Sequence, residues 1–145
     1  MIKKVLTLVF LGVVLASCSI FKCKKGDAVA KLDGSWELNY ITGPRIAFDG
    51  LYPNKKPIIT FNVKESQVSG NNSCNSYTGK LAVEGHKINF SEHPMISTKM
   101  MCVDGQGEQV YMNTLQKITS YDITEDGKVL TFISGDIAMM RFEKK

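Results

Sequence analysis

The sequence predicts an α+β protein, mostly antiparallel β, with a curled sheet or cracked barrel of about eight short strands and one helix. Three observations support this fold class. Short runs that alternate apolar and polar residues recur from residue 35 to residue 143, which is the period of half-buried strands. Asp126-Gly127 and Gly135-Asp136 separate such runs with dipeptides typical of hairpin turns. A sheet with this many strands must curl or close to protect its edges, and one helix could cover an opening.

The composition describes one ordinary globular domain. The chain has 145 residues, enough for one core, and its 43% hydrophobic and 22% charged residues exclude wholesale disorder. The formal net charge is +4, and Lys3 and Lys4 at the N-terminus account for two of these charges. The remaining excess is too small to indicate a nucleic-acid-binding protein.

Residues 1–17 are predicted to be a bacterial export signal. Lys3 and Lys4 give it a positive start, and residues 5–15 form an apolar run of 11 residues. As a helix this run would be about 17 Å long. A membrane span needs roughly 20 residues, so the run suits the apolar part of a signal peptide.

The motif Leu15-Ala16-Ser17-Cys18 ends this run and resembles the lipobox of bacterial lipoproteins. The resemblance implies cleavage before Cys18, a diacylglycerol on its thiol and a further acyl chain, such as palmitate, on its amine. Several acyl chains together make a stable membrane anchor. The alternative is a signal cut elsewhere that leaves Cys18 unmodified. In enteric bacteria an aspartate directly after the lipidated cysteine implies retention in the inner membrane. This chain has Ser19 there, so the resemblance favours the outer membrane. The protein is expected to face the periplasm, and display on the cell surface stays open.

Two stretches are predicted to lie outside the sheet. Residues 18–31 would form the lipidated N-terminus and a polar tether, so the folded domain would span residues 32–145. Residues 42–57, rich in glycine and proline, would form a long loop that could be a flexible lip over one end of the fold.

The strand pattern is clearest in residues 35–41. Trp36, Leu38 and Tyr40 share one face there, and Trp36, the only tryptophan, is assigned to the core. The eight predicted strands are residues 35–41, 57–63, 67–70, 77–84, 87–90, 120–124, 129–134 and 137–143.

Residues 108–119 are the best helix candidate. Val110, Tyr111 and Leu115 fall near one face, and the stretch contains neither glycine nor proline. Glu108 lies in the predicted first turn, where the helix dipole favours a carboxylate. We therefore expect Glu108 to have a structural role and not an acid–base one.

Cys74 and Cys102 are the only cysteines in the globular part of the chain. Cys74 belongs to a turn rich in glycine and asparagine, and Cys102 ends the motif Thr98-Lys99-Met100-Met101-Cys102. In an oxidising compartment a disulfide between them is favoured, because closing a loop of about 29 residues contributes roughly 3–4 kcal/mol. The residues expected to cap turns around Cys74 are Asn71, Asn72 and Asn75.

Other roles for the cysteines stay open at this point. Cys23 is the odd cysteine and could pair with Cys74 or Cys102, stay free or cross-link two chains. Cys74 and Cys102 could instead be free thiols, a nucleophile, or metal ligands with His86 or His93, although the spacing matches no known metal motif. Five methionines could form a soft-metal site or an adaptable apolar groove, but ordinary core positions are the favoured interpretation. They are Met95, Met100, Met101, Met139 and Met140.

The motifs together resemble the META domain of HslJ-like bacterial lipoproteins. The matching residues are 32–38, 57–61, 68–70 with 74–79, 98–102, Glu108 before Leu115, and the terminal hairpins. The resemblance covers about residues 32–143, and Asn72-Ser73 departs from it where many members carry glycine. It implies a small antiparallel β domain with a helix in the bacterial envelope. The family is associated with heat shock and envelope stress, and the resemblance supplies no catalytic residues.

The sequence therefore predicts a non-enzymatic outer-membrane lipoprotein that acts in envelope stress or homeostasis through protein partners. The expected site residues are Cys18 for lipidation and Cys74 and Cys102 for a disulfide, with no metal, no cofactor and no nucleic acid. The alternative is a periplasmic β-barrel module that binds a small ligand or a peptide. A hydrolase or redox enzyme would need Cys74 or Cys102 as a free thiol of low pKa.

Overall fold

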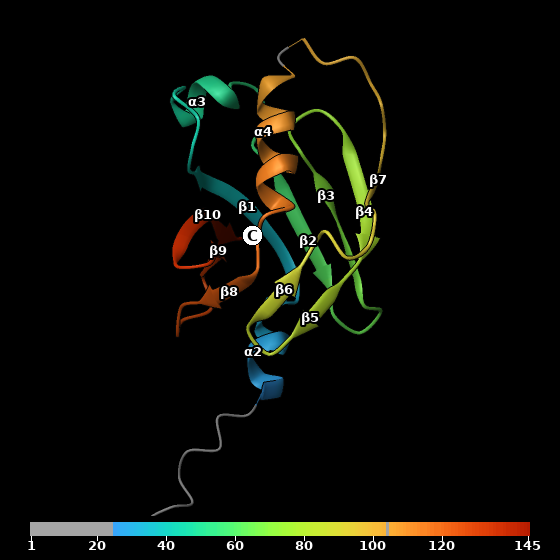
Figure 1. Cartoon of the computed structure of the whole chain (residues 1–145), viewed down its shortest axis with the longest axis vertical. Helices are drawn as coiled ribbons and strands as arrows, with labels where there is room; N and C mark the ends of the chain where they lie inside the picture. Colours follow the sequence, from blue (N-terminus) through green and yellow to red (C-terminus); the bar gives the residue numbers. More distant parts are fainter. Residues whose placement is uncertain (1–24, 104) are drawn as a thin grey trace, which may run out of the picture.

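The computed structural model describes residues 25–103 and 105–145, and in this part of the chain ten strands form one antiparallel sheet (Figure 1). The strands are β1 (Gly34–Ile41), β2 (Ile58–Asn62), β3 (Gln67–Asn71), β4 (Ser76–Lys80), β5 (Ala82–Glu84), β6 (Lys87–Asn89), β7 (Ile96–Ser97), β8 (Ser120–Ile123), β9 (Val129–Ser134) and β10 (Ile137–Lys144). Their order in the sheet is β5-β6-β8-β9-β10-β1-β2-β3-β4-β7. The two edges are therefore β5 and β7.

The described residues also form the helices α2 (Lys25–Leu32), α3 (Phe48–Leu51) and α4 (Gln106–Leu115). The sheet curls, and α4 lies along its inner side with Tyr111 and Leu115 fully buried (Figure 1). Helix α2 packs at the opposite end of the sheet from α3, in contact with β5 and β8. No helix of the described part has both the length and the apolar character needed to cross a bilayer.

The predicted fold class, mostly antiparallel β in a curled sheet, is confirmed, but the numbers of strands and helices are larger than predicted. The single strand predicted at residues 77–84 is two strands, because the chain turns at Leu81, whose backbone N–H donates to the Ser66 carbonyl at 2.8 Å. Strand β7 lies at residues 96–97, where no strand was predicted. Helix α2 occupies the second half of the predicted tether, with Asp27 in its first turn and Lys31 in its last, as the helix dipole favours.

The core fills the space between the curled sheet and α4. Trp36 is fully buried, as predicted, and its indole N–H donates to the Leu32 carbonyl at 2.8 Å. The other fully buried large side chains are Tyr111, Tyr121, Phe61, Phe132, Phe142, Leu32, Leu38, Ile59, Ile88, Leu115 and Leu130. The interior is therefore occupied by the protein's own side chains.

Strand β1 does not keep the predicted alternation to its end. Its register with β10 shifts between Leu38 and Tyr40, so one extra residue is inserted there as a β-bulge. The bulge turns Tyr40 outward, where it is 43% exposed beneath Arg141, and turns Ile41 into the core. The prediction that Tyr40 shares the inner face was therefore wrong.

Helix α4 begins at Gln106 and ends at Leu115, earlier than the predicted end at residue 119. After Leu115 the chain closes tighter turns, with the Ile118 N–H donating to the Leu115 carbonyl at 3.3 Å. At the other end, Gly107 packs so closely on Leu51 and Tyr52 that a Cβ there would overlap the Leu51 carbonyl oxygen. The Tyr52 hydroxyl donates to the Gly107 carbonyl at 3.0 Å, so the long loop is fixed to α4 and does not stand free as a lip.

Candidate functional site: the disulfide cluster

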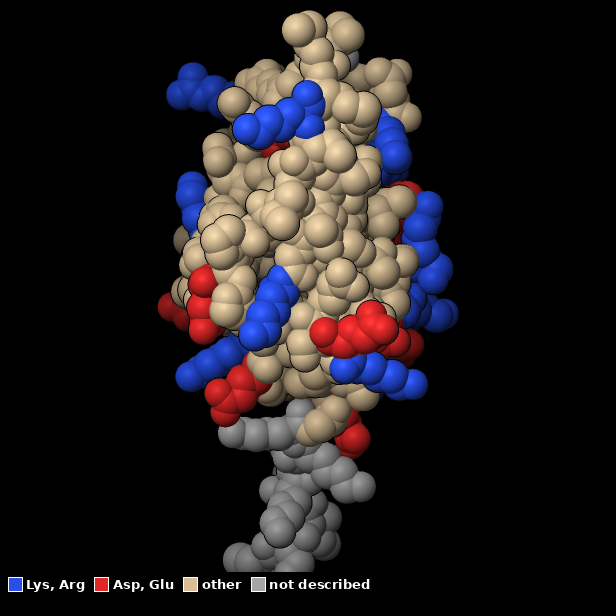
Figure 2. Space-filling model, turned by 90° about the vertical axis from the view of Figure 1, so that its right-hand side faces the viewer, with Lys and Arg blue, Asp and Glu red and all other residues tan. Residues whose placement is uncertain are grey.

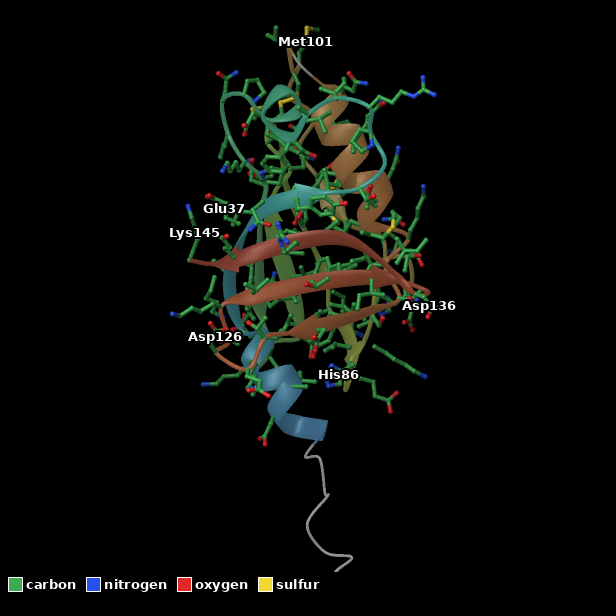
Figure 3. The ribbon with its side chains drawn as sticks, turned by 90° about the vertical axis from the view of Figure 1, so that its left-hand side faces the viewer. Glu37, His86, Met101, Asp126, Asp136 and Lys145 are labelled. Atoms are coloured by element: carbon green, nitrogen blue, oxygen red, sulfur yellow. A yellow bond between two sulfur atoms is a disulfide. The ribbon has the colours of Figure 1, made fainter. Side chains whose placement is uncertain are left out.

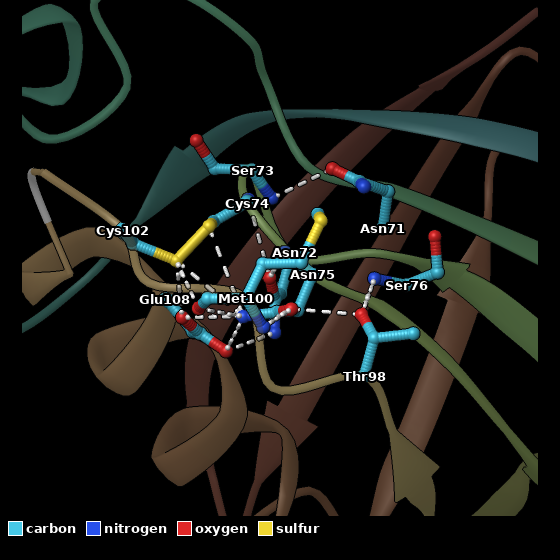
Figure 4. The surroundings of a disulfide bond; sticks show 10 residues. All are labelled: Asn71, Asn72, Ser73, Cys74, Asn75, Ser76, Thr98, Met100, Cys102 and Glu108. Atoms are coloured by element: carbon cyan, nitrogen blue, oxygen red, sulfur yellow. Dashed lines mark hydrogen bonds between the residues drawn. A yellow bond between two sulfur atoms is a disulfide. The ribbon is translucent and has the colours of Figure 1, made fainter.

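Cys74 and Cys102 form a disulfide, with their Cα atoms 6.0 Å apart (Figure 4). Cys74 lies in the turn between β3 and β4, and Cys102 lies between β7 and α4. The predicted pairing is confirmed, and it excludes a bond from Cys23 to either residue in this state. Cys18 and Cys23 themselves lie outside the described residues. We call Asn72, Cys74, Asn75, Cys102 and Glu108 the disulfide cluster.

Asn72 shapes the turn that carries Cys74. Its side chain is fully buried, and its Oδ1 accepts hydrogen bonds from the backbone N–H groups of Asn75 at 2.7 Å and Cys74 at 3.3 Å. The preceding Asn71 accepts from the Ser73 N–H at 2.9 Å, and Ser73 has a positive φ of 92°. Both asparagines therefore cap the turn, as predicted, and hold a strained serine in place.

Asn75 connects the turn to the segment after β7. Its side chain is 2% exposed, and its Oδ1 accepts from the Thr98 hydroxyl at 2.7 Å and the Met100 N–H at 2.8 Å. Its Nδ2 donates to the Met100 carbonyl at 3.3 Å and to Glu108 Oε1 at 3.0 Å. The sequence suggested only a turn cap for Asn75, because nothing in the local pattern shows which distant backbone its amide will reach.

Glu108 closes the cluster from the first turn of α4, the position the sequence predicted. Its Oε1 accepts from Asn72 Nδ2 at 3.0 Å, in addition to the Asn75 contact. Its Oε2 lies 3.1 Å from the Cys102 sulfur, which has no hydrogen to donate while it is bonded to Cys74. A carboxylate at this distance disfavours a thiolate on Cys102, and a thiolate is what reduction of the disulfide would produce.

The cluster is also the place where a metal could be considered. The ligand atoms of Cys74, Cys102 and Glu108 all lie within 4.8 Å of one another. The two sulfurs are bonded to each other, however, so a metal would need the reduced pair. His86 and His93, the histidines considered from sequence, do not belong to this group. The ring Nδ1 of His86 lies 3.2 Å from the Tyr121 carbonyl oxygen, at the end of the molecule opposite Met101 (Figure 3).

Beneath the cluster, a pair of buried tyrosines joins α4 to the sheet. The hydroxyls of Tyr77 in β4 and Tyr111 in α4 lie 2.7 Å apart. Burial raises the pKa of both phenols well above the usual range, so both remain neutral at physiological pH. Gly70 in β3 makes room for the pair, because a Cβ there would overlap the Ile58 carbonyl oxygen and press against the Tyr77 hydroxyl.

Two surface hollows flank the segment that carries Cys102. One, of about 430 Å³, lies between residues 97–102 and α4, with Met100 and Met112 in its lining. The other, of about 230 Å³, lies on the side of Leu51 and Cys74.

The methionines divide between core and surface. Met140 is buried, and Met95 and Met139 pack against the core, as predicted. For two of the five the prediction was wrong, because Met100 is 60% exposed and Met101 is 99% exposed. Both exposed methionines flank the hollows beside Cys102.

Comparison with known proteins gives one family, and the solved structures of similar fold include two determined by NMR. The META domain family matches residues 29–145. An NMR structure of a protein from Burkholderia xenovorans has a TM-score of 0.65 and 22% identity, over 81% of this chain and 86% of that one. A second NMR structure has a TM-score of 0.57 and 16% identity, over 83% of this chain and 94% of that one. No curated protein matches.

Proposed function

Because the chain belongs to the META domain family, we propose that it is a lipid-anchored protein of the bacterial envelope that works through protein partners and not as an enzyme. In this proposal Cys18 carries the lipid and the outer membrane holds the protein on its periplasmic side. The domain would contribute to envelope homeostasis or to the stress response.

The anchoring part is supported by the N-terminal sequence. The positive start, the apolar run and the motif Leu15-Ala16-Ser17-Cys18 occur in the order that an exported lipoprotein requires. A stable disulfide between Cys74 and Cys102 also fits an oxidising compartment outside the cytoplasm.

The observation that carries the non-enzymatic part is the state of the cysteines. The two thiols that could have acted as nucleophiles are joined to each other, and Glu108 beside them opposes the thiolate form. The residues around the disulfide position a backbone segment instead. Met101 and Val103 are 99% and 100% exposed beside this rigid bridge, which suits a surface that contacts another protein.

The second candidate, a module that binds a small ligand or a peptide, has one observation in its favour. The hollow of about 430 Å³ between residues 97–102 and α4 combines methionine side chains with polar groups. The filled interior speaks against a ligand inside the curled sheet. A ligand would therefore have to bind at the surface.

Fractionation of cells tests the anchoring, and mass spectrometry tests the cysteine state. We expect the wild-type chain to fractionate with the outer membrane and a Cys18→Ala variant to lose that association. A Cys18→Ala protein that still fractionates with membranes would contradict the lipid anchor.

Native mass spectrometry with and without reductant should show one disulfide and no retained metal or small molecule. Alkylation of Cys74 or Cys102 under native conditions would reopen the reactive-thiol hypothesis.

A further inference from the structure

Residues 96–101, which we call the edge segment, form an exposed margin of the sheet next to α4. Strand β7 pairs on one side with β4, in the register Tyr77↔Ser97 and Thr78↔Ile96, and no strand of residues 25–103 or 105–145 pairs with its other side. Every residue of the edge segment is exposed to solvent. The edge segment therefore lies at the surface along its whole length.

Hydrogen bonds on the β4 side extend this edge beyond the two residues of β7. The Thr98 N–H donates to the Ser76 carbonyl at 3.0 Å, and the Met100 N–H donates to Asn75 Oδ1 at 2.8 Å. The side-chain amide of Asn75 binds both the N–H and the carbonyl of Met100. It therefore makes the two hydrogen bonds that the backbone of a further β4 residue would make in a continued ladder. In an antiparallel ladder alternate residues bond inward, so the N–H and C=O groups of Ser97 and Lys99 point away from β4.

The other sheet edge lacks these features. Strand β5 has only three residues and ends with Glu84. Lys87 of the neighbouring strand β6 lies opposite this glutamate. Charged side chains of this kind protect an edge from pairing with other chains. The edge segment carries a single charge, Lys99, within an otherwise apolar and hydroxylated sequence.

The surroundings of the edge segment combine apolar and polar side chains. Ile96 is 75% exposed, and Met100 forms one wall of the hollow of about 430 Å³ whose other wall includes Met112 of α4. Figure 2 shows this face of the molecule, with an uncharged area across its middle, basic side chains above it and charged side chains of both signs below it. A strand placed here would find outward backbone groups beside a hollow that offers two methionine side chains among polar groups.

We propose that the edge segment binds an extended segment of a partner protein, which adds to β7 as an antiparallel strand. The partner segment would form backbone hydrogen bonds to Ser97 and Lys99, place an apolar side chain between Met100 and Met112, and carry a carboxylate that faces Lys99. Asn75 and the disulfide fix the edge segment before binding, which reduces the entropic cost of association. This inference deepens the proposed function, because it names the surface and the chemistry of the partner.

Lys99 argues against a second copy of the chain as the occupant. Two edge segments paired around Lys99 would bring like charges opposite each other, which destabilises a strand pair. An acidic partner segment would instead gain from the same lysine. The charge therefore favours a partner protein over self-association.

The test uses the full chain as recovered from an exporting bacterial host and a capped peptide of alternating threonine and valine with one central aspartate. NMR titration should show shift changes and slowed amide exchange at Ser97 and Lys99, and none at Val83 on the β5 edge. A Ser97→Pro variant removes one outward N–H while keeping the β4 pairing, since proline is tolerated on an edge strand. It should bind about three- to tenfold more weakly, and its matched control, Ser97→Ala, should bind as the wild type does.

Two further binding measurements test the role of Lys99 and of the backbone hydrogen bonds separately. Lys99→Glu should lose affinity for the aspartate peptide and bind the same peptide with a central lysine. A peptide N-methylated at alternate amides should fail to bind, which tests strand addition even if Ser97→Pro does not fold.

Several results would overturn the inference. One is no binding of the aspartate peptide, and another is protection at Val83 in place of Ser97. Protection of Ser97 that rises with protein concentration without peptide would assign the edge to a second copy. Shift changes at Met101 and Val103 with phosphatidylglycerol vesicles, and none with peptide, would assign this end of the molecule to a lipid surface. None of these outcomes depends on Cys18, so failure here is distinguishable from failure of the anchoring proposal.

Discussion

The hairpin region, formed by β8, β9 and β10, and the disulfide cluster hold their backbones by different means. In the hairpin region, ladder pairs such as Tyr121↔Phe132 and Phe132↔Met140 run along three strands over buried side chains. In the disulfide cluster, one covalent bond and the side chains of Asn72, Asn75 and Glu108 hold an irregular segment. The first region distributes its stability over many contacts, and the second concentrates it in a few polar groups.

The largest effect is expected from a change in the hairpin region. Phe132 packs against Phe61, Phe90 and Phe142, with ring centroids 6.3, 5.4 and 5.0 Å away. Phe132→Ala should lower the free energy of unfolding by about 3–5 kcal/mol in urea titrations, because it leaves a cavity in the core. The neighbouring Thr131→Ala is the control and should change stability by about 0.5 kcal/mol or less. A loss below about 1 kcal/mol for Phe132→Ala would show that the core is loosely packed.

Removing the disulfide should cost less and should act locally. The double variant Cys74→Ala with Cys102→Ala is expected to lose about 2–4 kcal/mol, measured by urea unfolding. Amide exchange should accelerate around residues 98–103 and stay unchanged in β9. Equal acceleration in both regions would contradict the comparison, because it would show that the two regions open together.

Alkaline pH should weaken the contact between α4 and β4. Burial raises the pKa of Tyr77 and Tyr111, so the folded chain keeps both phenol protons after the unfolded chain begins to lose them near pH 10. Stability is therefore fully present below about pH 10 and falls as the pH rises further, by up to about 1.4 kcal/mol per pH unit for each tyrosine. Urea unfolding of the wild type, Tyr77→Phe and Tyr111→Phe should give smaller slopes against pH for the two variants. A wild-type stability that does not change up to about pH 11 would contradict the buried pair.

The smallest expected change in stability is that of Glu108→Gln. Glutamine keeps an acceptor for Asn72 and Asn75, so unfolding should become easier by about 1 kcal/mol or less. Without the carboxylate 3.1 Å from Cys102, a thiolate forms more readily, and dithiothreitol should reduce the disulfide about three- to tenfold faster. Thiol-labelling kinetics measure this rate. An unchanged rate would mean that Glu108 does not control the reactivity of the disulfide.

The same contrast explains what the sequence could predict. Strand β9 has the predicted bounds, because alternation and the Asp-Gly and Gly-Asp turns are local features. Tyr40 was placed on the wrong face because a one-residue bulge in β1 depends on the pairing with β10 and not on β1 itself.

The candidate site was only partly predictable for a related reason. The pairing of Cys74 with Cys102 was favoured from sequence by the oxidising compartment and by their place in the globular part of the chain, although pairings with Cys23 stayed open. The reach of Asn75 to Met100 and Glu108 was missed, because it joins residues 25 and 33 positions away in the chain. Strand β7 was missed with it, since two residues carry no measurable period. The exposure of Met100 and Met101 follows from that tertiary arrangement.

Amide hydrogen exchange along the edge segment of the full chain tests the central claim most directly. The account holds that Asn75 and the disulfide continue the β4 ladder through Met100 and leave alternate backbone groups facing solvent. It predicts slow exchange at Thr98 and Met100, fast exchange at Ser97 and Lys99, and loss of protection at Met100 in Asn75→Ala. Uniformly fast exchange from residue 96 to residue 101 would contradict it, because the segment would then be a loose loop and not a preformed edge.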